Sequence, residues 1–385
     1  MKGIKRIGMA AAFALTAGGA MAAEGVDLPS TLVMTAYGTG STGYTQMVAV
    51  GNLLQNEYDT AVRILPGEND VSRMTPLRTG RVPLCACGIS SYFASEGVMM
   101  FSGSEWGPQP LRVITTSTAS FGLGLAVAGD IDVDTPADLE GRRVAYIRGA
   151  DAINLGTEAY LAFGGLSWDD VERVTYPGYG ASFDGIIADR ADASYASTTA
   201  PHVQRLAASP RGIVWPRLDP DDAEAWARLQ SVAPYFQPAE ITSAAGDYGP
   251  EQPWAGATYP YPILLGTPDL DDKTAYGLIK VMTEDHDRYK DAAPGNDGYA
   301  LERQNMEWII PFHDAVVRYY KEIGEWNDSM QAHQDRLVAR QELLAETWQR
   351  YNAGDPPADA EAFRDGWMKA RTRALEAADM RVVFR

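Results

Sequence analysis

The residues whose types and spacing could do chemistry lie near the N-terminus, where three glycines alternate with hydroxyl side chains. They are, in order, Gly38, Thr39, Gly40, Ser41, Thr42, Gly43 and Tyr44. An apolar run precedes them and residues at helical spacing follow, so the turn should open a helix. A helix N-terminus presents free backbone N–H groups, glycine lets a ligand approach them closely, and the hydroxyl groups add donors. The segment therefore predicts a site that binds an anion.

The same glycines form the pattern Gly38-x-Gly40-x-x-Gly43, which between a strand and a helix is the dinucleotide-binding fingerprint. That fingerprint calls for an acidic residue about 20 positions later. Here the corresponding stretch begins with Arg63, and Glu68 comes late. A secreted dinucleotide-dependent enzyme is therefore kept as an alternative, and we expect no cofactor.

The sequence does not contain the common catalytic motifs. It has no Gly-x-Ser-x-Gly elbow and no His-Glu-x-x-His pair, and its four histidines are scattered. Its many acidic residues are most simply solvated surface. We therefore expect a binding protein without a catalytic residue or a metal site, and a hydrolase that uses two carboxylates is the remaining enzymatic alternative.

The elements around the glycine segment alternate between strand and helix. A strand over 61–65, a helix that ends at Arg78 and a strand over 82–87 follow the first helix. This order predicts a parallel sheet with right-handed crossovers. A glycine-rich apolar strand over 121–128 is a candidate for a crossing between two lobes, and a strand over 261–266 for the return.

A second strand-to-helix junction is predicted near Arg148. Thr135 can cap a short helix, and a strand then runs into Arg148 and Asp151 before a helix over 154–164. Two such helix N-termini could face each other across a cleft. Arg148 could pair a ligand carboxylate, or it could be a surface arginine paired with Asp151. Asp151 could hold a ligand amine or act as an N-cap.

Cys85 and Cys87 are the two cysteines, and on a strand their side chains point to the same face. A disulfide between residues so close in sequence should be strained, so we expect two small core residues. No histidine or third cysteine stands nearby to complete a metal site.

The chain of 385 residues has a formal net charge of −18 and 45% apolar residues. It can bury a sizeable core, most simply in two lobes, and its acidity argues against nucleic acid and anionic membranes as partners. At the N-terminus, basic residues precede an apolar run that ends at Ala20-Met21-Ala22. This pattern predicts a signal peptide over 1–22 and a periplasmic protein.

The C-terminal part has two helical stretches, over 329–351 and 358–378, joined by a Gly-Asp-Pro-Pro segment. Because the first has only a sparse apolar face, we expect a clasp on the core or a contact in a dimer. The protein would then be a monomer or a dimer through this extension. We also expect a loop over 234–254, which is rich in proline and glycine, and a helix over 308–323.

Three segments, taken in order, are typical of one known family. They are residues 38–44, Asp138-Leu139-x-Gly141-Arg142-Arg143-Val144 and Pro311-Phe312-His313-x-x-Val316-x-Arg318-Tyr319-Tyr320-Lys321-Glu322-x-Gly324. Together they resemble the TAXI family, the solute-binding receptors of tripartite ATP-independent periplasmic (TRAP) transporters. The resemblance covers 32–326, and the remaining chain has no counterpart in the family's usual pattern.

The resemblance implies an α/β fold with two lobes, the type II flytrap of periplasmic binding proteins, to which the helices predicted from the sequence would add a C-terminal extension. Lobe I would comprise 24–126 and 256–326, lobe II 127–255, and the extension 327–385. The solute would be a small carboxylate or an amino acid such as glutamate or 2-oxoglutarate, and the partners would be TRAP membrane subunits. The alternative function is that of a periplasmic sensor, which would bind the solute in the same way but dock on a membrane kinase.

The resemblance also places ligand contacts at the glycine segment, at the end of the third strand, at 149–153 and at 198–201. With Arg148 added, the predicted ligand-binding set is Gly38, Thr39, Gly40, Ser41, Thr42, Gly43, Tyr44, Gly88, Arg148, Asp151, Ala152, Ile153, Thr198 and Thr199. Two family elements are changed here. The usual Ser-Gly-Thr is replaced at 151–153, and the usual Gln-Ser-Asp at 88–90, so hydroxyl and amide donors are lost at both places.

Overall fold

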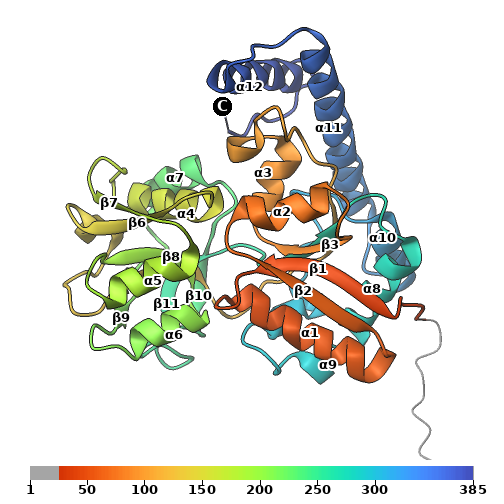
Figure 1. Ribbon diagram of the computed structural model, residues 1–385. Helices are drawn as coiled ribbons and strands as arrows, with labels where there is room; N and C mark the ends of the chain where they lie inside the picture. Colours follow the sequence, from red (N-terminus) through yellow and green to blue (C-terminus); the bar gives the residue numbers. More distant parts are fainter. Residues whose placement is uncertain (1–25, 385) are drawn as a thin grey trace, which may run out of the picture.

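Two lobes lie side by side, each around its own five-stranded sheet, and two long C-terminal helices stand against one of them (Figure 1). The computed structural model describes residues 26–384, and the predicted signal peptide at 1–22 lies outside them. The predicted two-lobed α/β architecture with a helical C-terminal extension is confirmed.

Lobe I is built on a sheet with the strand order β2-β1-β3-β12-β4. Its strands are β1 (Thr31–Tyr37), β2 (Ala61–Gly67), β3 (Leu84–Cys87), β4 (Arg112–Thr115) and β12 (Ile263–Gly266). Strands β1, β2 and β3 run parallel as predicted, and β12 returns antiparallel between β3 and β4. The helices of this part are α1 (Thr42–Tyr58), α2 (Asp70–Arg78), α3 (Ser90–Glu96), α8 (Asp272–Glu284), α9 (His286–Tyr289) and α10 (Asp314–Glu322). Short 3-10 turns lie at Met99–Phe101, Asn296–Tyr299 and Leu301–Arg303.

The first helix begins where the sequence predicts. Ser41 caps it, because its Oγ accepts a hydrogen bond from the backbone N–H of Tyr44 at 3.3 Å. Asp59 ends it in the left-handed conformation, with φ of 54°. Buried residues at helical spacing, such as Met47 and Leu54, turn into the core. The glycine segment is thus held between a buried strand and a well-anchored helix.

Lobe II has the strand order β7-β6-β8-β5-β9. Its strands are β5 (Leu123–Ala128), β6 (Arg143–Ile147), β7 (Glu172–Tyr176), β8 (Ala193–Ser197) and β9 (Ile213–Val214). Its helices are α4 (Asp151–Phe163), α5 (Tyr179–Ile187), α6 (Pro201–Ala207) and α7 (Ala223–Val232), with a 3-10 turn at Pro136–Leu139. Strand β5 straddles the predicted lobe boundary between residues 126 and 127.

A hairpin replaces part of the loop that we predicted over 234–254. Strand β10 (Gln237–Ile241) pairs antiparallel with β11 (Trp254–Thr258). The prediction was wrong at these positions because the two strands meet across a long connection, which local composition does not reveal. The hairpin lies between the two lobes (Figure 1).

The predicted helix over 308–323 is present only from Asp314 onward. Upstream, the backbone N–H of Phe312 donates to Gln334 Oε1 at 2.8 Å, and that of His313 to the carbonyl of Val113 at 2.9 Å. His313 then caps α10 through its Nδ1, which accepts from Ala315 N–H at 3.2 Å. Tertiary hydrogen bonds thus replace the helical ones in the first half of the predicted helix.

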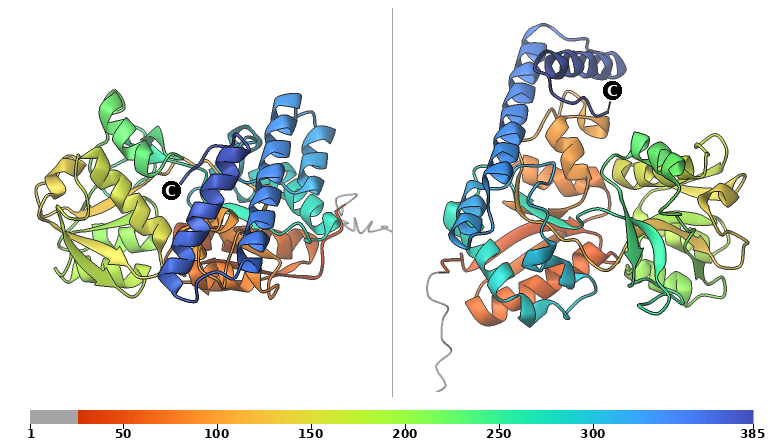
Figure 2. Two further views of the ribbon diagram at one scale, coloured as in Figure 1. Left: turned by 90° about the horizontal axis from the view of Figure 1, so that it is seen from above. Right: turned by 180° about the vertical axis from the view of Figure 1, so that it is seen from behind.

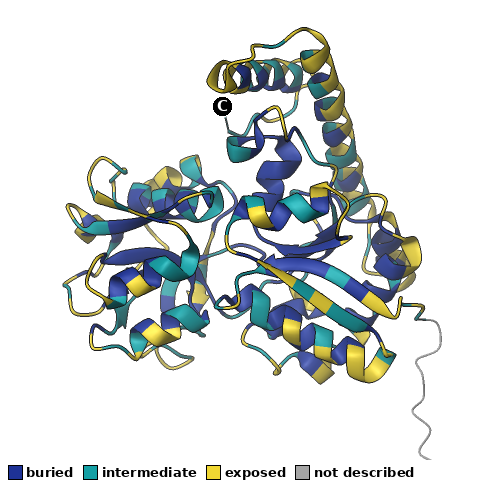
Figure 3. Ribbon diagram, viewed as in Figure 1, coloured by how far each residue is buried: buried dark blue, intermediate teal, exposed yellow. Residues whose placement is uncertain are grey.

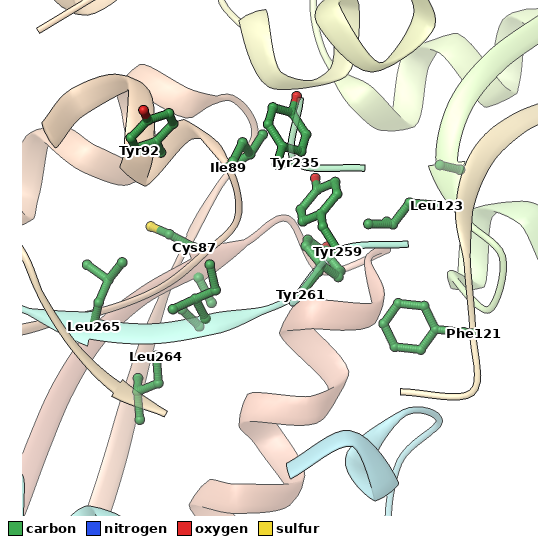
Figure 4. Packing of buried hydrophobic residues seen from close by; sticks show 14 of the residues in the cluster. Cys87, Ile89, Tyr92, Phe121, Leu123, Tyr235, Tyr259, Tyr261, Leu264 and Leu265 are labelled. Atoms are coloured by element: carbon green, nitrogen blue, oxygen red, sulfur yellow. The ribbon is translucent and has the colours of Figure 1, made fainter. Parts of the chain in front are cut away.

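Buried residues lie in the interiors of both lobes and also in the segments between the lobes (Figure 3). The two chain crossings meet there. Phe121 and Leu123 lie on the outgoing crossing, and Tyr259 and Tyr261 on the return (Figure 4). The rings of Phe121 and Tyr261 are 6.0 Å apart and nearly perpendicular.

The C-terminal extension packs on lobe I. It consists of α11 (Asp328–Ala353) and α12 (Ala360–Ala377), which lie beside α3 in both orientations of Figure 2. Arg340 Nε binds Glu96 Oε1 at 2.6 Å, and Arg371 pairs with the other oxygen of Glu96. Trp367 Nε1 donates to the carbonyl of Gly97 at 2.6 Å. The predicted clasp on the core is confirmed, and a dimer through the extension stays a prediction.

Cys85 and Cys87 form a disulfide, which corrects our expectation of two separate core thiols. Their side chains share one face of β3, and their Cα atoms are 5.5 Å apart, within the range that a disulfide spans. Both residues are fully buried. The bond therefore lies inside the core of lobe I, one residue before Gly88.

We expect this disulfide to contribute little to stability, because it closes a very short loop of the unfolded chain. The chain-entropy relation gives about 1.5 kcal/mol for such a loop. Urea unfolding of the unmodified protein with and without a thiol reductant should show a loss of this size. The double variant Cys85→Ala/Cys87→Ala is the control and should not respond to reductant; equal responses of the two proteins would contradict the prediction.

Candidate functional site

A pocket lies between the lobes, at the ends of strands from both sheets. It is partly open to solvent. Its wall is formed by Tyr37, Gly38, Ser41, Thr42, Gly67, Glu68, Asn69, Asp70, Arg73, Ile89, Leu123, Ala150, Ala152, Ile153, Tyr179, Tyr195, Ala196, Ser197, Ala200, Tyr259 and Tyr261. Both predicted strand-to-helix junctions therefore border one cavity.

The glycine segment contributes Gly38, Ser41 and Thr42 to the wall. Ser41 Oγ donates to the carbonyl of Gly38 at 2.7 Å while it caps α1. Thr42 Oγ1 lies 2.8 Å from Ser197 Oγ and 3.2 Å from Thr199 Oγ1, both in lobe II. The hydroxyl groups predicted to face a ligand thus hold the turn and join the lobes.

The other residues of the glycine segment lie around the pocket. Thr39 is exposed, and with Tyr44 it borders a separate surface groove along α1 and α9. Gly43 lies against the Tyr37 ring, which a Cβ would contact at 2.5 Å. Gly40 lies against the imidazole of His202 in lobe II. Both glycines therefore serve close packing behind the wall.

The second junction contributes Ala150, Ala152 and Ile153. The backbone N–H of Ala152 donates to Asp70 Oδ2 of lobe I at 2.9 Å. Arg148 is exposed, forms no salt bridge among the described residues and does not line the pocket. The pairing of Arg148 with Asp151 that we kept open is therefore not formed.

Asp151 is the first residue of α4 and does not cap it, so the N-cap interpretation is wrong. Its Oδ2 instead accepts from the backbone N–H of Met100 in lobe I at 2.9 Å. Burial raises the pKa of this carboxyl above its ordinary value, and the Met100 hydrogen bond acts in the opposite direction. Asp151 thus joins the lobes at the rim of the pocket.

The remaining predicted residues support the wall from outside. Gly88 lies against the Tyr37 hydroxyl and the Tyr261 ring. Thr198 Oγ1 accepts from Gly122 N–H at 3.0 Å and donates to the carbonyl of Ser243 at 2.7 Å. Thr198 therefore fixes the outgoing crossing, and Thr199 bonds Thr42 as described above.

Sequence reasoning missed Asp70 and Arg73, the two buried charged residues of the pocket wall. Arg73 Nη2 lies 2.5 Å from Asp70 Oδ1, and the two side chains are 4% and 2% exposed. The guanidinium carbon is 4.0 Å from the centre of the Tyr37 ring. Arg73 Nε has no hydrogen-bond partner among residues 26–384. One buried cation of the pocket thus keeps a free donor.

A signal for this pair was present in the sequence. Asn69 and Ser72 form a capping box at the start of α2, which follows β2 as a third strand-to-helix junction. Asp70 and Arg73 are spaced for one helix face. The sequence predicted a helix that ends at Arg78 without a site residue, although Asp70 and Arg73 of this helix line the pocket.

Five tyrosines form much of the remaining wall: Tyr37, Tyr179, Tyr195, Tyr259 and Tyr261. Burial raises the pKa of Tyr261 to about 12, so its hydroxyl stays a donor at neutral pH. Rings and hydroxyl groups together can receive an apolar group with a few polar contacts.

His202 gives the contact between the lobes a dependence on pH. Its ring stacks on Phe183 and lies against Gly40 across the cleft. Burial lowers its pKa below the ordinary 6.5, with Arg205 acting in the same direction and Asp184 against it. The closed arrangement therefore favours neutral imidazole, and it loses stability as pH falls below about 6.5.

Ligand affinity should accordingly decrease between pH 7 and pH 5.5. For each unit by which the pKa of His202 is lower in the closed state than in the open state, affinity falls by about tenfold once the pH is below both values. Titration calorimetry at several pH values measures this decrease, and His202→Gln should flatten the profile. A profile that is unchanged in the variant would contradict the role of His202.

The geometry defines an α/β protein of two lobes with a pocket between them. Residues 34–324 match the NMT1-like family, and the chain belongs to that family. No curated protein matches the sequence.

Within residues 26–384, no helix is both long and apolar enough to cross a membrane. In the same part of the chain, no group of three or more His, Cys, Asp or Glu is placed to hold a metal ion.

Several solved structures are similar to this chain. The alkanesulfonate-binding protein SsuA of Xanthomonas axonopodis pv. citri, bound to MOPS, is 17% identical, with 83% of this chain and 95% of that chain covered and a TM-score of 0.38. PhnD1 of Prochlorococcus marinus, in complex with methylphosphonate, is 12% identical, with 77% and 100% covered and a TM-score of 0.41. A putative L-cystine ABC transporter protein of Listeria monocytogenes is 11% identical, with 71% and 99% covered and a TM-score of 0.42.

Proposed function

We propose that this protein is a periplasmic solute receptor of the TAXI type. It binds a small organic carboxylate or amino acid between its lobes and delivers it to the membrane subunits of a TRAP transporter. The proposal rests on the site and on the three family-like segments, and it involves no chemical conversion of the solute.

The observation that carries the proposal is the unpaired Nε of Arg73 in the wall of a pocket between two lobes. A buried guanidinium with a free donor favours a carboxylate, since charge-assisted hydrogen bonds are strong in a site that excludes water. The N-terminus of α1, which has no acidic residue in its first turn, adds partial positive charge. An anionic group is therefore attracted both by Arg73 and by this helix.

Binding is coupled to closure because the same residues line the pocket and join the lobes. Asp70 N–H donates to the carbonyl of Gly149 at 3.1 Å, and Asp70 Oδ2 accepts from Ala152 N–H at 2.9 Å. Thr42 and Ser197 add a third link at 2.8 Å. A solute that contacts both walls favours the closed arrangement, which is the principle of hinge-closing receptors.

Delivery to a TRAP transporter is supported by the family resemblance and by the predicted signal peptide. The net charge of −18 leaves room for a docking partner that carries basic loops. Co-purification of the protein with candidate membrane subunits tests delivery. Retention by a sensor kinase instead would assign the protein to signalling.

Titration calorimetry of the mature protein with a panel of C3 to C6 carboxylates and amino acids tests the binding itself. We expect at least one member of the panel to bind with a dissociation constant in the micromolar range or below. No binding by any member, together with turnover of an ester or glycoside, would overturn the proposal.

A further inference from the structure

The charges that line the pocket do not match a dianion. The lining residues carry one positive side chain, Arg73, and two carboxylates, Asp70 and Glu68. Asp70 already pairs with Arg73. Glu68 is exposed at the rim, where its Oε1 would lie 2.6 Å from a Cβ on Gly38. A solute with two carboxylates would therefore place one of them without a cation and near Glu68, which is unfavourable in a partly dehydrated site.

The remaining wall is aromatic and aliphatic. The five tyrosines already named are joined by Ile89, Leu123 and Ile153, and these side chains come from both lobes. Burial of an apolar group against such a wall is favourable, whereas burial of a second charge is not. The bulk of the solute should thus be apolar or aromatic.

The buried pair of Asp70 and Arg73 presents a negative and a positive group side by side. Within residues 26–384, the buried Nε of Arg73 has no partner, and a solute carboxylate that reaches it would supply one. Among the same residues Asp70 Oδ2 accepts one backbone N–H, from Ala152, which leaves it capacity for a second donor. An ammonium group near Asp70 would also face tyrosine rings, which attract cations. One α-carbon that carries both a carboxylate and an ammonium group complements this pair.

Building on the proposed function, we propose that the pocket takes an α-amino acid with an apolar or aromatic side chain and discriminates against dicarboxylates. The zwitterionic head lies on the Asp70–Arg73 pair, and the side chain lies among the tyrosines. The solute is then neutral overall, and its zwitterionic head matches the neutral Asp70–Arg73 pair.

The test is titration calorimetry of the mature protein with six probes. L-phenylalanine and L-leucine carry the full proposed head, 3-phenylpropanoate lacks the ammonium group, phenethylamine lacks the carboxylate, and L-glutamate and 2-oxoglutarate carry a second carboxylate. We expect phenylalanine or leucine to bind at least tenfold more tightly than each of the other four.

Two variants test whether Asp70 is the residue that recognises the ammonium group. Asp70→Asn should bring the affinities for phenylalanine and 3-phenylpropanoate to within about threefold of each other. Asp272→Asn removes a surface carboxylate that pairs with Arg318 and does not line the pocket, and it should leave that ratio unchanged. Because the probe panel is first measured on the unmodified protein, the inference can be decided even if Asp70→Asn does not fold.

The possible outcomes distinguish failure of the amino-acid inference from failure of the proposed receptor function. Equal or tighter binding of 3-phenylpropanoate, glutamate or 2-oxoglutarate would overturn the amino-acid inference and leave the receptor function standing. Binding by none of the six probes, while another carboxylate binds, would also overturn only this inference. Failure of every carboxylate and amino acid would overturn the receptor function as well.

Discussion

Replacement of Arg73 by methionine is expected to weaken binding of the carboxylate solute about 100-fold or more, because it removes the cation of the pocket. It should also lower the free energy of unfolding by about 3–5 kcal/mol, since Asp70 is left buried without its partner. Methionine keeps the apolar stem of arginine, but it removes the guanidinium and with it the contact with the Tyr37 ring. Titration calorimetry and urea unfolding measure the two effects.

Two further variants distinguish the loss of the Arg73 charge from a general loss of structure. Arg148→Met removes an exposed arginine that lies outside the pocket wall, and it should change neither affinity nor stability. The double variant Asp70→Asn/Arg73→Met should recover part of the lost stability without recovering binding, because the uncompensated charge is gone. Normal affinity in Arg73→Met would contradict the assignment of Arg73 as the anion-binding residue.

The second large effect is expected at Glu96, which joins lobe I to the C-terminal extension. Glu96→Gln leaves the guanidinium of Arg371, which is fully buried, and that of Arg340, which is 12% exposed, without their shared carboxylate. The cost should be about 3–5 kcal/mol in the free energy of unfolding. Ligand affinity should stay within a few-fold, because none of the three side chains lines the pocket.

A surface ion pair provides the matched control for this measurement. Asp184 pairs with Arg205 at 2.6 Å, but the two side chains are 58% and 53% exposed. Asp184→Asn should therefore cost less than about 1 kcal/mol. If Glu96→Gln costs no more than this control, the extension is held by its apolar contacts, such as those of Phe384 with Tyr92 and Phe93 of α3, and the charge cluster is dispensable.

The elements that the sequence predicted well are those with local signals. The capped helix after Ser41, the short helix after Thr135 and the strand before Arg148 each depend on residues within a few positions of one another. Such signals determine where a helix begins and which strand precedes it. They therefore placed two junctions correctly, and both junctions border the pocket.

The residues that the sequence did not place depend on contacts across the fold. Arg148 was a reasonable anion-binding candidate by position, but its side chain is exposed to solvent, and the buried arginine is Arg73 on another helix. Thr42 was expected to donate to a ligand, yet its hydroxyl bonds residues of lobe II. The direction of a side chain at a helix start depends on the packing of both lobes, which no short segment encodes.

The attachment of the extension to α3 also bears on how the receptor moves. Helix α3 starts at Ser90, directly after the wall residue Ile89, and ends at Glu96, which α11 and α12 hold by two arginines. The extension thereby becomes part of lobe I and enlarges it. In a hinge-closing receptor we therefore expect the extension to move together with lobe I, while Ala152 and Tyr195 move with lobe II and its half of the pocket.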